Sequence, residues 1–314
     1  MATRSSARKY RNVEEKKSFI KETWFIILAT LLAVVLLLYP VAATQWNNYR
    51  QQQVSDAYSQ NVDQLDGSGG NPDASSIVQA AKEYNTRNAA GPIIDPWSSR
   101  VSKDNKVYQE YLHELNTLEE MSQVIIPSIN VNLPVYHGTE DDTLQKGLGH
   151  LFGTALPVGG KNTHAVITGH TGMPDATMFD NLSKLKTGDV FYVNTYGKKM
   201  KYQVYDIEVV LPEETDSLWP IKEKDLITLI TCTPYGVNSH RLLVHAERVP
   251  MDEQEEQEID KKVSFLSFQW WMILFIGIAL VAIFLLTIWL ANTGRKIRNH
   301  NNRVDRITAR RIHK

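Results

Sequence analysis

The single cysteine of the sequence is the residue whose surroundings most favour catalysis. Cys232 follows an apolar, β-branched run at 226–231, which predicts a buried strand, and Pro234 and Gly236 then break that strand. A second apolar run begins at Arg241, so a hairpin would bring this guanidinium beside the thiol. A fixed positive charge stabilises the thiolate, which is the nucleophilic form. A buried, inert thiol is the alternative that these residues leave open.

A cysteine nucleophile needs a partner that exchanges protons near neutral pH, and histidine is the natural choice. His170 has the most suggestive local sequence, because it follows a predicted buried strand at 165–168 and has a glycine close by on each side. Glycines allow close backbone approach and unusual dihedral angles. Three other histidines are rivals for this role: His150, His164 and His240. We predict no metal site, because no two histidines have ligand spacing on one element.

Two uncharged apolar stretches, at 24–43 and 270–290 of the 314 residues, are long enough to cross a bilayer. Lysines and arginines cluster before the first stretch and after the second, which predicts that both termini are cytoplasmic and that the intervening chain is extracellular. The sequence at 41–43 resembles a signal-peptidase site, but the long apolar run favours an uncleaved anchor. The lipid bilayer is therefore one expected partner, and the net charge of −1 argues against nucleic acid.

This location strengthens the catalytic interpretation of the cysteine. Outside the cytoplasm cysteines tend to pair, and a cysteine without an intramolecular mate is either a reactive thiol or an intermolecular link. We therefore favour a reactive thiol at Cys232.

Short runs separated by turn residues predict a strand-rich domain from residue 121 onward. The predicted strands are 124–127, 131–136, 165–168, 190–193, 201–210, 227–231 and 242–247. Their spacing predicts a single antiparallel barrel or sandwich of about 130 residues, with Pro127 and Pro134 at strand ends or edges. Two helices are predicted before this domain, at 77–87 and 108–120.

Three motifs of this chain resemble those of sortases, the membrane-bound cysteine transpeptidases of Gram-positive bacteria. The sequence TLITC at 228–232 resembles the TLxTC signature, TGH at 168–170 matches the histidine motif, and Arg241 matches the arginine of the following strand. The resemblance covers 121–250 and implies a mainly β, closed barrel with short helices, an N-terminal helical and lid extension, and one transmembrane helix at each end. It implies catalytic roles for Cys232, His170 and Arg241, and supporting roles for Thr231, Thr168 and Gly169.

A further motif resembles the pilin-polymerising class C of that family. The sequence Asp95-Pro96-Trp97 is similar to a lid in which the aspartate pairs with the catalytic arginine and the aromatic ring covers the cysteine. The resemblance implies cleavage of an LPxTG-like sorting signal between Thr and Gly through a thioacyl-enzyme, and transfer to a lysine of the next pilin subunit. No cofactor is expected.

These expectations divide the chain into seven segments. They are a cytoplasmic N-terminus at 1–22, a transmembrane helix at 23–44, a helical and lid region at 45–120, the catalytic barrel at 121–250, a solvated acidic stalk at 251–266, a second transmembrane helix at 267–291 and a basic cytoplasmic tail at 292–314. Two alternatives remain. One is a housekeeping sortase that attaches proteins to cell-wall precursor, and the other is a non-catalytic, membrane-tethered scaffold.

Overall fold

The computed structural model describes residues 4–65, 73–87, 95, 105–259, 263–264 and 266–312. The chain divides into two compact units. One comprises Met1–Ala42 together with Phe268–Lys314, and the other is Ala43–Ser267.

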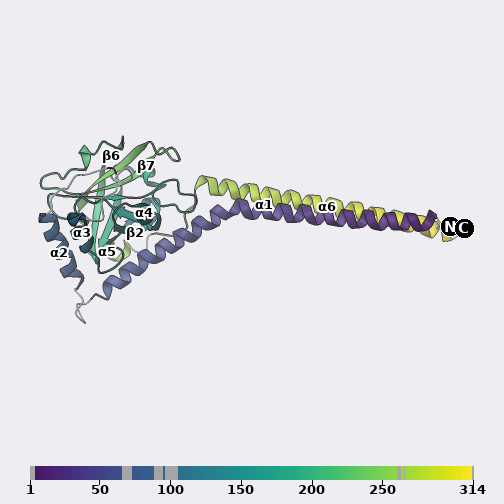
Figure 1. The fold of residues 1–314 in the computed structure, drawn as a ribbon, viewed down its shortest axis with the longest axis horizontal. Coiled ribbons are helices and arrows are strands. Elements are labelled where there is room, and N and C mark those ends of the chain that lie inside the picture. Colours follow the sequence, from purple (N-terminus) through teal and green to yellow (C-terminus); the bar gives the residue numbers. More distant parts are fainter. Residues whose placement is uncertain are drawn as a thin grey trace. The chain divides into compact units, whose positions relative to one another are not determined.

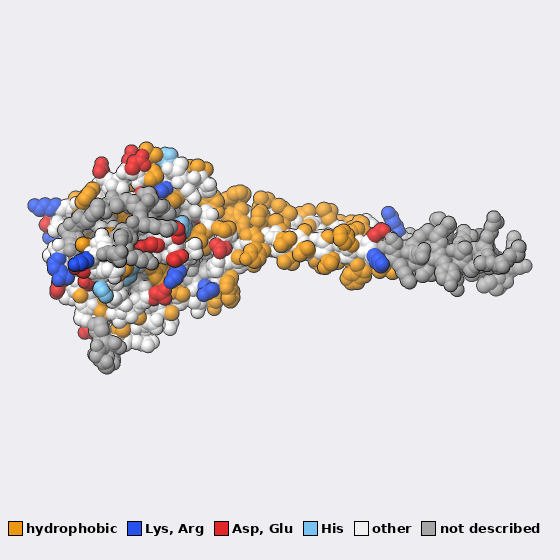
Figure 2. Space-filling model, viewed as in Figure 1, with side chains coloured by type: hydrophobic (Ala, Val, Ile, Leu, Met, Phe, Trp, Pro, Cys, Tyr) orange, Lys and Arg blue, Asp and Glu red, His pale blue; other side chains and the backbone are white. Residues whose placement is uncertain are grey.

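The first unit consists of two long apolar helices. They are the N-terminal part of α1 (Arg4–Asp63) and α6 (Trp270–Ile312). The segments Ile20–Asp63 and Trp270–Asn299 are long and apolar enough to cross a membrane, and hydrophobic side chains cover their described surface (Figure 2). They are candidate membrane spans. Helix α1 continues without interruption through the polar sequence that follows the apolar stretch, so its C-terminal part belongs to the second unit.

The second unit contains a closed barrel of eight described strands (Figure 1). The strands are β1 (Ser122–Ile126), β2 (Val131–His137), β3 (Leu148–His150), β4 (Thr163–Thr168), β5 (Val190–Thr195), β6 (Lys198–Val210), β7 (Asp225–Thr233) and β8 (His240–Val249). They are hydrogen-bonded in the order β1-β2-β3-β4-β7-β8-β6-β5, and β1 pairs with β5 to close the barrel. The expected closed, mainly β barrel is confirmed.

The second unit also contains short helices. The α-helices are α2 (Ala74–Arg87), α3 (Lys106–His113), α4 (Asp141–Lys146) and α5 (Glu253–Glu258), and the 3-10 helices are η2 (Pro127–Ile129), η3 (Leu182–Lys184) and η4 (Asp216–Leu218). The buried face of α2 is formed by Ile77, Val78, Ala81 and Tyr84, which join the core that fills the barrel. Helix α3 is shorter than the predicted 108–120, because Leu115 adopts a φ of 51°, which an α-helix cannot accommodate.

The prediction of an antiparallel sheet is wrong at two places. β2 pairs with β3 in parallel, and β4 pairs with β7 in parallel. β4 and β7 are separated in sequence by the β5–β6 hairpin, which lies elsewhere in the barrel. Pro134 lies inside β2, at a position that is an edge of the sheet, as predicted. The sheet tolerates it because β3 pairs with β2 only from Val135 onward, so the position of Pro134 has a strand neighbour on one side.

The acidic sequence at 251–266 is not a wholly solvated stalk. Part of it forms α5, where Glu255 lies 2.8 Å from the Lys201 ammonium and accepts a hydrogen bond from the Tyr192 hydroxyl. Ile259 follows, and it is buried with Tyr192 and Ile125 against the outside of the barrel. The segment therefore packs on the barrel because one carboxylate and one apolar side chain both find partners there.

Candidate active site

The candidate site lies at the ends of three adjacent strands, β4, β7 and β8. Cys232 of β7 stands directly opposite Arg241 of β8 in the antiparallel register, as the predicted hairpin requires. Side chains two residues apart share a face of a strand. Cys232 therefore shares its face with Ile230, which packs with Val166 and Leu243 in a small cluster separate from the core that fills the barrel.

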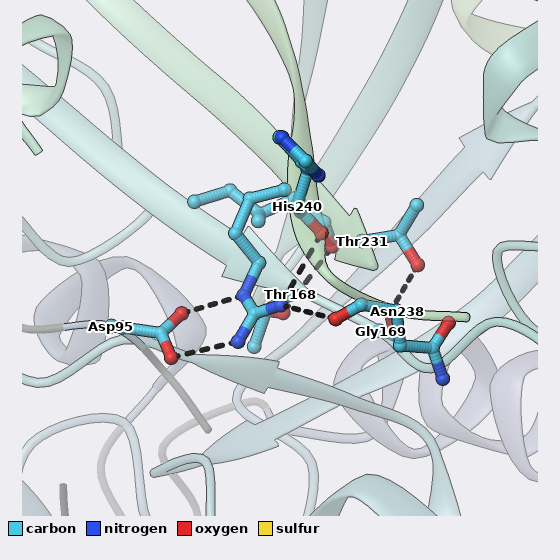
Figure 3. A network of polar contacts seen from close by, with 8 residues as sticks. Asp95, Thr168, Gly169, Thr231, Asn238 and His240 are labelled. Atoms are coloured by element: carbon cyan, nitrogen blue, oxygen red, sulfur yellow. Dashed lines mark hydrogen bonds and ion pairs between the residues drawn. The ribbon is translucent and has the colours of Figure 1, made fainter. Parts of the chain in front are cut away.

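His170 reaches the same place from β4. The β4–β7 ladder pairs Thr168 with Ile230, and it continues through a hydrogen bond from Gly169 N to Ile230 O of 3.0 Å. The Thr231 hydroxyl donates to Gly169 O at 2.7 Å (Figure 3), and the buried Thr168 hydroxyl donates to Ile230 O at 3.2 Å. In a parallel ladder the next residues, His170 and Cys232, are then level with each other.

The residue before His170 is a glycine because the space around position 169 is too small for a side chain. A Cβ atom at this position would lie 2.6 Å from Leu148 Cδ2 and 2.8 Å from Phe179 Cδ2, so the residue faces the packed interior. Because side chains alternate along an extended chain, His170 is directed to the opposite face, which is the face of Cys232. The half-buried position of His170 agrees with this placement.

The Arg241 guanidinium is bound by Asp95 through two parallel hydrogen bonds (Figure 3). Arg241 Nε donates to Asp95 Oδ1 at 2.7 Å, and the Arg241 NH2 group donates to Asp95 Oδ2 at 2.9 Å. The remaining NH1 group lies 3.2 Å from the carbonyl oxygens of Asn238 and His240. Asp95 is 5% exposed and Arg241 9% exposed, so the pair is largely removed from water. Pro96 and Trp97, the other two residues of the predicted lid, lie outside the described residues.

The charges around the thiol favour its neutral form in this state. Burial raises the pKa of Cys232, the positive charge of Arg241 acts in the opposite direction, and the negative charge of Asp95 raises the pKa further. Burial is the largest single influence on the pKa of Arg241 and would lower it, but the hydrogen bonds with Asp95 and the negative charges of Cys232 and Asp95 together raise that pKa. Asp95 thus pairs with the guanidinium whose charge would otherwise stabilise a thiolate at Cys232.

The imidazole of His170 is also in its neutral form near pH 7. Burial lowers the pKa of His170, and the carboxylate of Asp141 on α4 partly opposes that shift. The charges of Cys232, Arg241 and Asp95 therefore affect one another's pKa values. His170 lies at the neighbouring strand end, where the carboxylate of Asp141 affects its pKa instead. Neither the thiol nor the imidazole carries the charge expected of an activated pair.

The rival histidines do not share this position. His150 is fully buried, with Nε2 2.8 Å from Ala155 O and Nδ1 3.1 Å from the Tyr111 hydroxyl. His164 is buried six residues before His170, about 20 Å along an extended chain, where it contacts the Thr228 hydroxyl at 2.6 Å. His240 is adjacent to Arg241 on β8, so its side chain points to the other face of the sheet.

Buried neutral histidines predict a loss of stability in mild acid. Burial lowers the pKa of both His150 and His164 from 6.5 to about 4. As the pH falls from 6.5 toward 4, the unfolded chain takes up protons that the folded chain does not bind, so the free energy of unfolding decreases by roughly 3 kcal/mol for each histidine. Urea unfolding at several pH values should show this decrease, and its slope should be shallower in His150→Gln. An equal slope in the variant would contradict the prediction.

The close contacts at Gly169 predict a second effect. Gly169→Ala should force Leu148 or Phe179 to move, because its new methyl group would stand within 3 Å of both. Overpacking of this kind costs about 1–3 kcal/mol, and the displacement should reach His170, the next residue. Urea unfolding should show the lower stability, and a variant as stable as the wild type would show that the strand end adapts freely.

Asp180 is a residue of the site region that sequence analysis missed. Its carboxylate accepts hydrogen bonds from Gly172 N at 2.7 Å and from the Thr171 hydroxyl at 3.1 Å, just after His170. Burial raises its pKa to about 6, against the effect of these two hydrogen bonds. No signal in the sequence marks this aspartate among the others, because its role depends on the folding back of the loop. Among the described residues, no group of three or more His, Cys, Asp or Glu side chains is arranged to hold a metal ion.

Comparison with known proteins relates this chain to one family. A family model for the sortase domain matches residues 124–249. Sortase A of Streptococcus agalactiae serotype III (strain NEM316) is 28% identical over 135 residues, which cover 42% of this chain and 54% of that protein. The match therefore spans about half the length of this curated relative.

Solved structures are similar over a longer part of the chain. The structure of sortase C-1 from Actinomyces oris is 58% identical, with a TM-score of 0.55, over 57% of this chain and 99% of that chain. Sortase A from Corynebacterium diphtheriae is 48% identical, with a TM-score of 0.58, over 68% of this chain and 100% of that chain.

Proposed function

This chain belongs to the sortase family of cysteine transpeptidases, with class C sortases among its structural neighbours, and from this premise we propose that it polymerises pilin subunits. It cleaves an LPxTG-like sorting signal between Thr and Gly, and it joins the Thr carbonyl group to a lysine of the next subunit. The observation that carries the proposal is the arrangement of Cys232 opposite Arg241, with His170 at the adjoining strand end.

Once Asp95 has left Arg241, the proton of the Cys232 thiol passes to His170. In the first half-reaction the resulting Cys232 thiolate attacks the Thr carbonyl carbon of the sorting signal. The C–N bond to Gly breaks, and protonated His170 gives its proton to the departing amine, which leaves a thioester on the sulfur. Arg241 donates hydrogen bonds to the substrate or to the oxyanion that forms on the carbonyl oxygen.

In the second half-reaction His170 takes a proton from the neutral lysine amine of the incoming pilin. The amine nitrogen attacks the thioester carbon, an isopeptide bond forms, and the sulfur departs as thiolate. The two half-reactions return every group to its starting state. No cofactor takes part.

Asp95 serves in this proposal as the part of a lid that keeps the enzyme inactive. Its two carboxylate oxygens take the Nε and NH2 donors of Arg241, which are the donors that a substrate needs. The resemblance to class C sortases assigns Pro96 and Trp97 to the same lid. Asp95 must leave Arg241 before the sorting signal can bind there.

The two apolar helices anchor the enzyme in the cell membrane. Both basic termini lie in the cytoplasm, as the flanking lysines and arginines favour, and the barrel is extracellular, where its pilin substrates are.

The acceptor specificity of the full chain tests this proposal. The protein, solubilised in detergent, is incubated with a sorting-signal peptide together with either a pilin subunit or purified cell-wall precursor. We expect the pilin to become joined through a lysine, as a mass increase on a lysine-containing fragment would show. Transfer only to the wall precursor would identify a housekeeping sortase instead, and no transfer to either acceptor would favour the non-catalytic scaffold.

A further inference from the structure

The loop that carries His170 is closed on itself at its base. We define the His170 loop as residues 169–180, which connect β4 to the residue before η3. Phe179 N donates to His170 O at 3.0 Å, and the Asp180 carboxylate binds Gly172 N and the Thr171 hydroxyl. These bonds hold the two ends of the loop together, but they do not hold its far part, residues 173–178.

The far part of the loop is held by helix α1. Asn47 Nδ2 donates to Asp175 O at 2.8 Å, and the Thr44 hydroxyl lies 3.4 Å from Pro174 O. Asn48 makes two bonds to one residue, because its Nδ2 donates to the Thr177 hydroxyl at 2.8 Å and its Oδ1 accepts from Thr177 N at 3.1 Å. These contacts lie within the second compact unit.

The spacing of these side chains shows that α1 contacts the loop with one continuous face. Residues 44, 47, 48 and 51 follow the pattern i, i+3, i+4, i+7, so they line one side of a helix. The fourth member, Gln51, is buried, and its Nε2 lies 3.3 Å from Met178 Sδ. A helix that only packed on a barrel would place apolar residues here. This one places hydroxyl and amide groups, and they bind backbone and side-chain groups of the loop.

Two side chains of the far part, Ala176 and Met178, are also buried in the core that fills the barrel, whereas Pro174 is exposed. Met173, Pro174, Asp175 and Ala176 line a cleft of about 800 Å³ that is also bordered by Arg50 and Val54 of α1. Beside this cleft, the loop backbone at Asp175 and Thr177 is hydrogen-bonded to side chains of α1.

We propose that Asn48 is a positioning residue for His170, acting through the two hydrogen bonds by which helix α1 holds the His170 loop. This inference rests on the proposed function, in which His170 exchanges protons with substrate. The same helix contains the candidate membrane span, so the element that anchors the chain also holds the catalytic imidazole at the end of β4. Asn48 touches no reacting atom.

Three variants of the full chain in detergent test this inference. Asn48→Leu has a similar volume and removes both hydrogen bonds to Thr177. Asn48→Asp keeps an acceptor for Thr177 N, and the Thr177 hydroxyl can turn to donate to the second oxygen. Gln53→Ala, at an exposed position of the same helix, is the matched control.

Kinetics with a sorting-signal peptide give the first measurement. For Asn48→Leu we expect a decrease in kcat of about tenfold to a hundredfold with KM within twofold of the wild type, because a misplaced imidazole impairs proton transfer rather than peptide binding. The alkylation rate of Cys232 should be unchanged, since the thiol lies on β7. Asn48→Asp should recover most of the kcat, and Gln53→Ala should equal the wild type. A wild-type kcat in Asn48→Leu would overturn the inference. A decrease in kcat accompanied by a comparable increase in KM and decrease in thiol reactivity would also overturn it, because it would indicate general damage to the fold.

Titration of the His170 ring by NMR gives a measurement that does not depend on activity. The signal is assigned by its loss in His170→Gln. Burial lowers the pKa of His170 in the wild type. In Asn48→Leu the released loop should expose the ring to water, so the pKa of His170 should rise toward its ordinary value. The carboxylate of Asp141 raises the pKa of His170, and it is present in both proteins, so it does not account for a difference between them. An unchanged titration in Asn48→Leu contradicts the inference, whereas a wild-type protein that forms no thioester contradicts the proposed function.

Discussion

Replacing Cys232 by alanine is expected to abolish transpeptidation, with a decrease in kcat on the order of 10⁴-fold to 10⁶-fold. The reason is chemical, because the proposed thioester needs the sulfur and this chain contains no other cysteine. The rate of joining a sorting-signal peptide to a pilin lysine, followed by mass spectrometry, measures the effect.

The same variant must remain folded for this result to be informative. Cys232 is 9% exposed at a strand end, so the loss of one sulfur atom should leave a small gap that opens toward the surface. We expect the thermal unfolding midpoint to stay within a few degrees of the wild type. A folded Cys232→Ala protein that retains transpeptidase activity would show that another residue is the nucleophile.

Replacing Asp95 by alanine is expected to raise the alkylation rate of Cys232 by up to about a hundredfold, if the closed lid leaves on the order of one per cent of molecules open. Two effects act in the same direction. Loss of the two hydrogen bonds to Arg241 releases the segment that contains Asp95, and loss of its negative charge removes one cause of the raised pKa of Cys232.

The pH dependence of alkylation separates these two effects. Thiolate forms as the pH rises through the pKa of the thiol, so a raised pKa delays alkylation to higher pH in the wild type. In Asp95→Ala the midpoint should move to lower pH, because Arg241 then acts on the sulfur without opposition. Asp142→Ala, which removes an exposed carboxylate of α4, is the control and should change neither rate nor midpoint. If Asp95→Ala behaves like this control, Asp95 does not restrain the site.

The parts of the site that depend on short-range sequence could be predicted. The β7–β8 hairpin places Cys232 opposite Arg241 with six residues between the two strands, so the apolar runs and the turn residues determine the pairing. Gly169 is necessary because a Cβ atom at this position would lie within 3 Å of Leu148 and Phe179, and a glycine before a candidate histidine is visible in the sequence.

The parts that depend on distant contacts could not be predicted from residue patterns. The parallel pairing of β4 with β7 joins segments that are about 60 residues apart, and β3 has only three residues, too few to show a period. The ion pair of Asp95 with Arg241 links positions 146 residues apart, and the family resemblance suggested it where periodicity could not. The polar face of α1 carries no apolar pattern, so its contact with the His170 loop was invisible before the fold was known.

Capture of the thioester on the full chain tests the central claim most directly. A sorting-signal peptide is added to the wild type, to Asp95→Ala and to Cys232→Ala, and the intact mass and the modified residue are determined before any acceptor amine is supplied. We predict an adduct on Cys232 that carries the peptide up to its Thr, formed fastest in Asp95→Ala and absent from Cys232→Ala. An adduct on a different residue, or no adduct in either protein that retains the cysteine, would contradict the account.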